Sequence, residues 1–194
     1  MRGGVNLNPT IDDLIAQFKS NQQDRGVTLD THQPHTLLLC CSDARSDPAI
    51  WIKTDLNELF IVRTPGNVIP PFDEQRPCGV IAGITYAIEK LPIKQCIVLN
   101  HSNCGGAEYL HSCHEPDTLP QLTSWMRLNG NRDKNPTLDP SQRTLINAYN
   151  NLILYPCIQK RRQLESLAIH ALFLDIKQAA IYRYQPERDE FDHL

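Results

Sequence analysis

The chain has 194 residues, of which 41% are hydrophobic, and a formal net charge of −3 at pH 7. This length allows one globular domain with a substantial core, and the weakly acidic charge predicts no nucleic-acid partner. No apolar run approaches the ~20 residues that a membrane-spanning helix needs, and residues 1–10 lack the apolar core of a signal peptide. We therefore expect a cytoplasmic protein with no membrane partner.

The sequence contains seven cysteines. In a chain without a signal peptide, an odd number favours reduced thiols and metal binding over a disulfide framework. Isolated cysteines are most often small buried hydrophobic residues. We interpret the following cysteines in this way: Cys40, Cys78, Cys96, Cys113 and Cys157.

The N-terminal half predicts helices and strands in alternation. Apolar residues recur at helical spacing over residues 11–19, which is typical of an amphipathic helix. Continuous apolar runs, of the kind buried on both faces of a parallel sheet, predict strands over residues 36–41, 59–62 and 95–99. Residues 79–90 carry an apolar face at helical spacing, so we expect a helix between the second and third strands.

The C-terminal half predicts further helices and a closing pair of strands. A loop over residues 112–120 is followed by a helical stretch over residues 122–128 and, after a polar linker, by a helix over about residues 141–154. Two apolar runs, residues 167–174 and 179–184, are separated by a tight turn, which implies an antiparallel pair.

Together these elements predict an α/β fold. We expect a central, mostly parallel sheet of four strands plus an antiparallel edge strand, flanked by helices. Residues 1–194 would form a single domain, with a helical N-terminal arm over about residues 1–30. In such sheets, ligands bind beyond the carboxyl ends of the strands, and functional residues are therefore expected there.

Candidate metal ligands follow two of these strands. The third predicted strand leads into His101, and Cys104 follows three residues later. An imidazole and a thiolate at that spacing can converge on one ion, and Gly105 and Gly106 permit a tight turn that leaves room for them. The first strand ends at Cys41, which can supply a third ligand. The sequence therefore predicts a zinc site between two strand ends.

An acidic and a basic residue accompany the proposed ligands. Asp43 follows Cys41 by two residues and can reach the fourth coordination position of zinc. Arg45 can hold the same carboxylate through its planar guanidinium group. The pair would act as a gate, because Asp43 bound to Arg45 leaves the metal open to water and Asp43 bound to zinc closes it. A purely structural zinc with four protein ligands is the alternative, and a competing Arg45 argues against it.

These segments resemble the signatures of the β-class carbonic anhydrases. The family's Cys-Ser-Asp-Ser-Arg corresponds to residues 41–45, and its Gly-His-Ser-x-Cys-Gly corresponds to residues 100–105. Residues 59–67 resemble the family's Phe-Val-Val-Arg-Asn-Ala-Gly-Asn segment, and residues 83–87 resemble its Ser-Leu-Glu-Tyr-Ala helix. The likeness runs from about residue 11 to the C-terminus.

The resemblance implies a zinc enzyme, a lyase, that reversibly hydrates carbon dioxide to bicarbonate by zinc-bound hydroxide. One Zn²⁺ per subunit would be held by Cys41, His101 and Cys104. Asp43 and Arg45 would form the gating dyad, with Asp43 on the metal in a closed state.

The resemblance also implies a substrate pocket and an assembly. The pocket would be lined by Phe60, Pro65, Tyr86, Gly105 and Gln33. The family's N-terminal helices embrace a second subunit and its pockets form at the dimer interface, so a homodimer or a dimer of dimers is expected.

Three positions depart from the family pattern. Asn100 replaces the glycine before the histidine, Pro65 replaces a small apolar residue, and His32 stands where one branch of the family has a glutamine, beside Gln33. Two other functions use the same ligands. One is a hydrolase of carbonyl sulfide or carbon disulfide on the same scaffold, and the other is a non-catalytic protein with a structural zinc.

Overall fold

The computed structural model describes residues 10–13, 15–16, 32–52, 58–112, 118–130, 135 and 137–194, and residues 110–112 by their backbone alone. The chain divides into two compact units, Met1–His32 and Gln33–Leu194. In the first unit, residues 11–13 and 15–16 are helical, and the rest of the helix predicted over residues 11–19 lies outside the described residues. The second unit carries the sheet.

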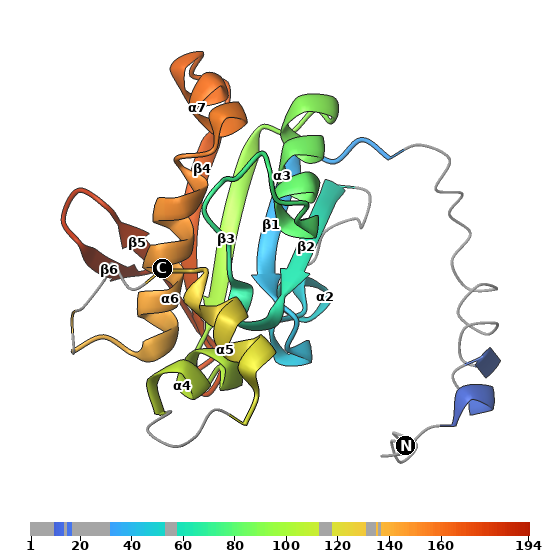
Figure 1. Cartoon of the computed structure of the whole chain (residues 1–194), viewed down its shortest axis with the longest axis vertical. Coiled ribbons are helices and arrows are strands. Elements are labelled where there is room, and N and C mark those ends of the chain that lie inside the picture. Colours follow the sequence, from blue (N-terminus) through green and yellow to red (C-terminus); the bar gives the residue numbers. More distant parts are fainter. Residues whose placement is uncertain are drawn as a thin grey trace. The chain divides into compact units, whose positions relative to one another are not determined.

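A six-stranded sheet in the order β2-β1-β3-β4-β5-β6 forms the centre of the second unit (Figure 1). Its strands are β1 Thr36–Cys41, β2 Leu59–Thr64, β3 Gln95–His101, β4 Ala168–Asp175, β5 Ala180–Gln185 and β6 Glu190–His193. Strands β2, β1, β3 and β4 are parallel, whereas β5 and β6 are antiparallel to their neighbours. The predicted α/β fold with a mostly parallel sheet is thereby confirmed. Strand β6 is an additional antiparallel strand that was not predicted.

Helices cover one face of this sheet. The helical elements are α2 Pro48–Trp51, α3 Gly79–Lys90, α4 Gly105–Ser112, α5 Pro120–Arg127, α6 Pro140–Leu152 and α7 Pro156–Gln163, with 3₁₀ turns η1 Ala44–Ser46 and η3 Pro65–Asn67. Helices α3, α6 and α7 lie over the same face (Figure 1). Among the described residues, none of the helices has the length and apolar character needed to cross a membrane.

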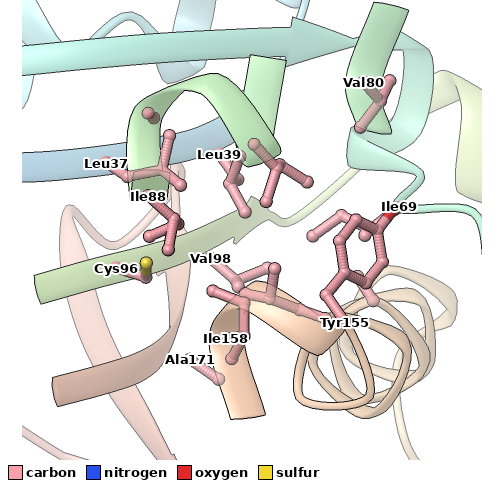
Figure 2. Close-up of a cluster of buried hydrophobic side chains, with 14 of the residues drawn as sticks. Leu37, Leu39, Ile69, Val80, Ile88, Cys96, Val98, Tyr155, Ile158 and Ala171 are labelled. Atoms are coloured by element: carbon pink, nitrogen blue, oxygen red, sulfur yellow. The ribbon is translucent and has the colours of Figure 1, made fainter. Parts of the chain in front are cut away.

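The main core lies between the sheet and these three helices. Figure 2 shows side chains of β1 and β3, such as Leu37 and Val98, meeting Ile88 of α3 and Ile158 of α7. Side chains alternate across a strand, so Leu38 of β1 belongs to a smaller cluster on the opposite face. All six residues of β1 are buried, which explains why its sequence is a continuous apolar run rather than an alternating pattern.

Two helices begin where no helix was predicted. Gly105 and Gly106 form the first turn of α4 rather than a tight turn, so the loop predicted over residues 112–120 is preceded by an additional helix. Pro156 lies in the first turn of α7, after α6 has ended at Leu152. Proline is well suited to that position, because its missing N–H would have no partner within the helix.

Candidate metal centre

Three potential metal ligands meet at the carboxyl ends of β1 and β3. The ligand atoms of Cys41, His101 and Cys104 all lie within 4.8 Å of one another, and the two Sγ atoms are 3.9 Å apart. The three residues are 5%, 1% and 2% exposed, respectively. Within the described part of the chain, this is the group of histidine, cysteine and acidic residues whose ligand atoms are close enough to share one ion.

The ring of His101 is oriented for ligation. Its Nδ1 lies 2.9 Å from the backbone oxygen of Ser102, and donation from Nδ1–H leaves Nε2 as the atom with a free lone pair. Nε2 is buried and has no hydrogen-bond partner in the described structure. A buried polar atom without a partner is costly, and a metal ion at this position would satisfy it. Two sulfurs and one imidazole nitrogen are a ligand set that some catalytic zinc sites use, with a fourth position left for water or substrate.

The two thiols influence each other's ionisation. A hydrogen bond from Cys104 is the main cause that lowers the pKa of Cys41, to about 4, and His101 contributes. The hydrogen bond to Cys41, together with burial, raises the pKa of Cys104, although N–H groups of Gly106 and Ala107 oppose the rise. Without a cation, therefore, the pair favours one thiolate and one thiol. A divalent cation between the sulfurs allows both to ionise.

The segment between His101 and Cys104 is fixed by the neighbouring strand β4 and the residue that follows it. The N–H of Ser102 donates to Leu174 O at 2.9 Å, and its Oγ accepts from the N–H of Ile176 at 3.0 Å. Asn103 adopts a left-handed conformation with φ 53°, and α4 starts two residues later. This sharp change of direction places Cys104 back beneath the end of β3, beside His101.

Asp43 and Arg45 form a close ion pair next to the cluster. Arg45 donates from Nη2 to Oδ2 at 2.6 Å and from its backbone N–H to Oδ1 at 2.9 Å. Its Nη2 also donates to Asn103 O at 3.0 Å, which links the pair to the segment that carries Cys104. These contacts, chiefly the side-chain hydrogen bond from Arg45, lower the pKa of Asp43 to about 2. The Oδ2 atom of Asp43 lies 3.9 Å from His101 Nε2.

Arg63 is a site residue that the sequence did not identify as functional. From β2, its Nε donates to Cys41 O at 3.0 Å and its Nη2 donates to Asp43 O at 2.9 Å. Its Nη1 donates to the carboxylate of Asp47 at 2.6 Å. One guanidinium group therefore binds the backbone at the ligand Cys41 and at Asp43 of the dyad. The sequence did contain a signal for the role of Arg63, since it is a charged residue inside an otherwise apolar strand.

The predicted pocket residues separate into two groups. Pro65 and Gly105 lie at the carboxyl ends of β2 and β3, on the same side of the sheet as the cluster. Phe60 pairs with Leu37, four positions before Cys41, which corresponds to about 13 Å along the strand. Tyr86 packs against Phe60, with ring centroids 5.8 Å apart.

Gln33 precedes β1 and is exposed, so it lies at the amino end of the strand that carries Cys41 at its carboxyl end. Within one chain, the structure therefore brings together the three ligands and the dyad, but it does not bring Gln33, Phe60 or Tyr86 to them.

Gly66 allows close packing beneath the centre. It has φ +67°, and a Cβ atom there would lie 2.7 Å from Cε of the buried Met126. We expect Gly66→Ala to lower the free energy of unfolding by roughly 2–4 kcal/mol, since it combines a left-handed backbone with overpacking. Urea denaturation measures this loss. The control is Gly79→Ala, where no atom lies within 4 Å, and equal stability losses in both variants would contradict the prediction.

The sheet and its helices make this an α/β protein. The buried Cys-His-Cys cluster at the carboxyl ends of its parallel strands is suited to metal binding. Residues 36–181 match the family model described as carbonic anhydrase. The chain belongs to the carbonic anhydrase family.

Relatives and solved structures agree with this assignment. The chain is 30% identical over 159 residues to a carbonic anhydrase of Pseudomonas aeruginosa, covering 76% of this chain and 72% of the relative. It is 31% identical over 179 residues to a carbonic anhydrase of Helicobacter pylori strain J99, covering 84% and 81%. The structure of the β-carbonic anhydrase CcaA superposes with a TM-score of 0.75 at 26% identity, covering 94% of this chain and 83% of that chain. The predicted β class and the predicted enzyme class, a carbonic anhydrase lyase, are confirmed.

Proposed function

We propose that this protein catalyses the reversible hydration of carbon dioxide to bicarbonate, with one zinc ion per subunit held by Cys41, His101 and Cys104. The observation that carries the proposal is the unpartnered, buried Nε2 of His101 within 4.8 Å of two cysteine sulfurs. Zinc bound there would act as a Lewis acid that lowers the pKa of water to about 7 and makes hydroxide available at neutral pH.

Asp43 and Arg45 would form the gating dyad. The carboxylate of Asp43 is held by Arg45 through Nε and Nη2, and a pKa of about 2 keeps it ionised at neutral pH. An ionised carboxylate beside the cluster can accept a hydrogen bond from the attacking water and so orient its lone pair toward the substrate. Arg45 also binds both carboxylate oxygens of Asp43 in this conformation, which supports an open site.

The start of α4 would stabilise the negative charge that develops on the substrate. Gly105 and Gly106 are the first two residues of this eight-residue helix, directly after Cys104. Backbone N–H groups at a helix N-terminus carry a partial positive charge. With no side chain on Gly105 and no atom within 4 Å of where a Cβ would lie, a small anion can approach the backbone closely.

A second copy of the chain would complete the pocket with Phe60, Tyr86 and Gln33. These residues lie away from the ligands of their own chain, and Tyr86 is 51% exposed. Strand β2 is an outer strand of the sheet in the described structure, so its free edge is available to a second copy. We expect a homodimer or a dimer of dimers in sedimentation-velocity experiments. A fully active monomer would contradict this prediction.

Stopped-flow assays test the proposed reaction. The zinc-loaded protein should hydrate carbon dioxide rapidly, and Asp43→Ala should lose most of this activity while retaining zinc. The same samples are assayed with carbonyl sulfide and carbon disulfide. Hydrolysis of these substrates without carbon dioxide hydration would favour the alternative hydrolase, and a zinc-loaded protein inactive on all of them would favour a structural zinc.

A further inference from the structure

The strands that carry Cys41 and His101 separate just before the ligands. The pairing of β1 with β3 ends at Cys40 and Leu99. Beyond that point Cys41 pairs with Thr64 of β2, whereas His101 pairs with Leu174 of β4. Backbone pairing between β1 and β3 therefore ends one residue before Cys41 and two residues before His101.

A buried amide connects the two strands where their pairing ends. The Nδ2 of Asn67 donates to Leu39 O at 3.0 Å and to Leu99 O at 3.2 Å, so it holds the backbones of both strands. Leu39 lies two residues before Cys41, and Leu99 lies two residues before His101. The side chain of Asn67 thus connects the two strands directly beneath their ligands.

Asn100 holds this amide in place. Its Oδ1 accepts from Asn67 Nδ2 at 2.7 Å, the shortest of the three contacts among which that nitrogen shares its two hydrogens. Its own Nδ2 donates to Ser141 O at 3.2 Å, in the first turn of α6. Both asparagines are 2% exposed. The anchoring turn of α6 is stabilised by a capping box formed by Asp139 and Gln142.

From this arrangement we propose that Asn100 is a positioning residue of the metal centre, acting through Asn67 on the separation of Cys41 and His101. The β-class signature has glycine at this position, which offers no acceptor to Asn67 and no donor to α6. This chain therefore supports its ligands with a buried connection to α6 that the signature residue cannot make. The inference rests on the proposed zinc site.

Zinc release tests the role of Asn100 without measuring turnover. The zinc-loaded protein is mixed with excess chelator and the release rate is measured. Asn100→Ala should release zinc about 10–100-fold faster, the range typical of residues that orient metal ligands. The cobalt-substituted variant should also show a shifted visible absorption spectrum, because the ligand geometry changes. Asn100→Ser keeps a hydroxyl that can accept from Asn67, so its release rate should lie between those of alanine and wild type.

A matched control separates positioning from a general loss of stability. Asn151 is also 2% exposed and donates from Nδ2 to Ile69 O at 2.7 Å and to Asn129 O at 3.2 Å. Asn151→Ala should lower the midpoint of urea unfolding while leaving zinc release and the cobalt spectrum unchanged. The proposal is overturned if both Asn100 variants release zinc at the wild-type rate, or if Asn151→Ala accelerates release equally. A wild type that holds zinc but does not hydrate carbon dioxide would refute the proposed function, and the release comparison would still decide the role of Asn100.

Discussion

A His101→Ala variant should lose its zinc and hydrate carbon dioxide no faster than protein-free buffer. The imidazole supplies one of three ligand atoms, and its Nε2 is the buried atom left without a hydrogen-bond partner. Two cysteine thiols 3.9 Å apart remain in the variant, and two ligands do not form the three-ligand site that catalytic zinc requires. Zinc content by atomic emission and hydration by stopped-flow absorbance measure the two losses.

His170→Ala is the control for this variant. His170 lies in β4, is partly buried and is not part of the ligand cluster. Its variant should keep full zinc content and turnover. The three-ligand account would be wrong if His101→Ala retained stoichiometric zinc and substantial turnover. Circular dichroism confirms that both variants are folded before their activities are compared.

An Asp43→Asn variant should keep its zinc but lose about 10²–10⁴-fold in kcat, the typical contribution of a positioned acid–base group. The substitution preserves the shape of the side chain and removes its charge. The amide can no longer form the ion pair with Arg45, which in the native protein includes a 2.6 Å contact. Stopped-flow kinetics, with zinc content measured on the same samples, give the change in kcat per bound zinc.

The matched control is Asp192→Asn, which breaks an exposed ion pair of the same length with Arg188, remote from the centre. Its kcat should remain that of the wild type. If Asp43→Asn hydrated carbon dioxide at the wild-type rate, the dyad would have no role in the reaction.

The low pKa of Asp43 also predicts that acid lowers the free energy of unfolding. Its folded-state pKa, about 2, is below the ordinary value, chiefly because of the hydrogen bond from Arg45. The ionised carboxylate therefore favours the folded state at neutral pH, and this contribution is lost as the pH falls from the ordinary value of 3.8 through about 2. Since Asp43 does not titrate near neutrality, the loss of activity in Asp43→Asn should not vary with pH there.

The sequence predicts the strands that carry the ligands well, since their burial on both faces requires apolar runs. The bounds of β1 and α3 agree with the predicted residues 36–41 and 79–90. Strand β3 extends two residues beyond the predicted end, as far as His101, because Asn100 and His101 are polar residues that tertiary contacts bury.

The missed elements have two physical causes. Helices α4 and α7 begin with Gly105 and Pro156, residue types that disrupt a helix interior but are accommodated in a first turn. The four residues of β6, Glu190–His193, alternate weakly and form a strand through pairing with β5.

The supports of the metal centre were harder to predict than its ligands. The ligands and the dyad lie in two short local patterns, whereas Arg63 acts through three acceptors on residues 41–47. Asn100 was visible as a departure from the family signature, and its hydrogen bonds to Asn67 and Ser141 depend on the folding of η3 and α6 against β3. A local pattern can identify a ligand, but it does not identify the residue that positions it.

A zinc titration of the metal-free protein tests the central claim most directly. Carbon dioxide hydration is measured by stopped flow after each addition of zinc. The rate should rise in proportion to bound zinc and stop rising at one ion per subunit, and His101→Ala should show no rise. A protein that binds one zinc per subunit and hydrates carbon dioxide no faster than the metal-free chain would contradict the account.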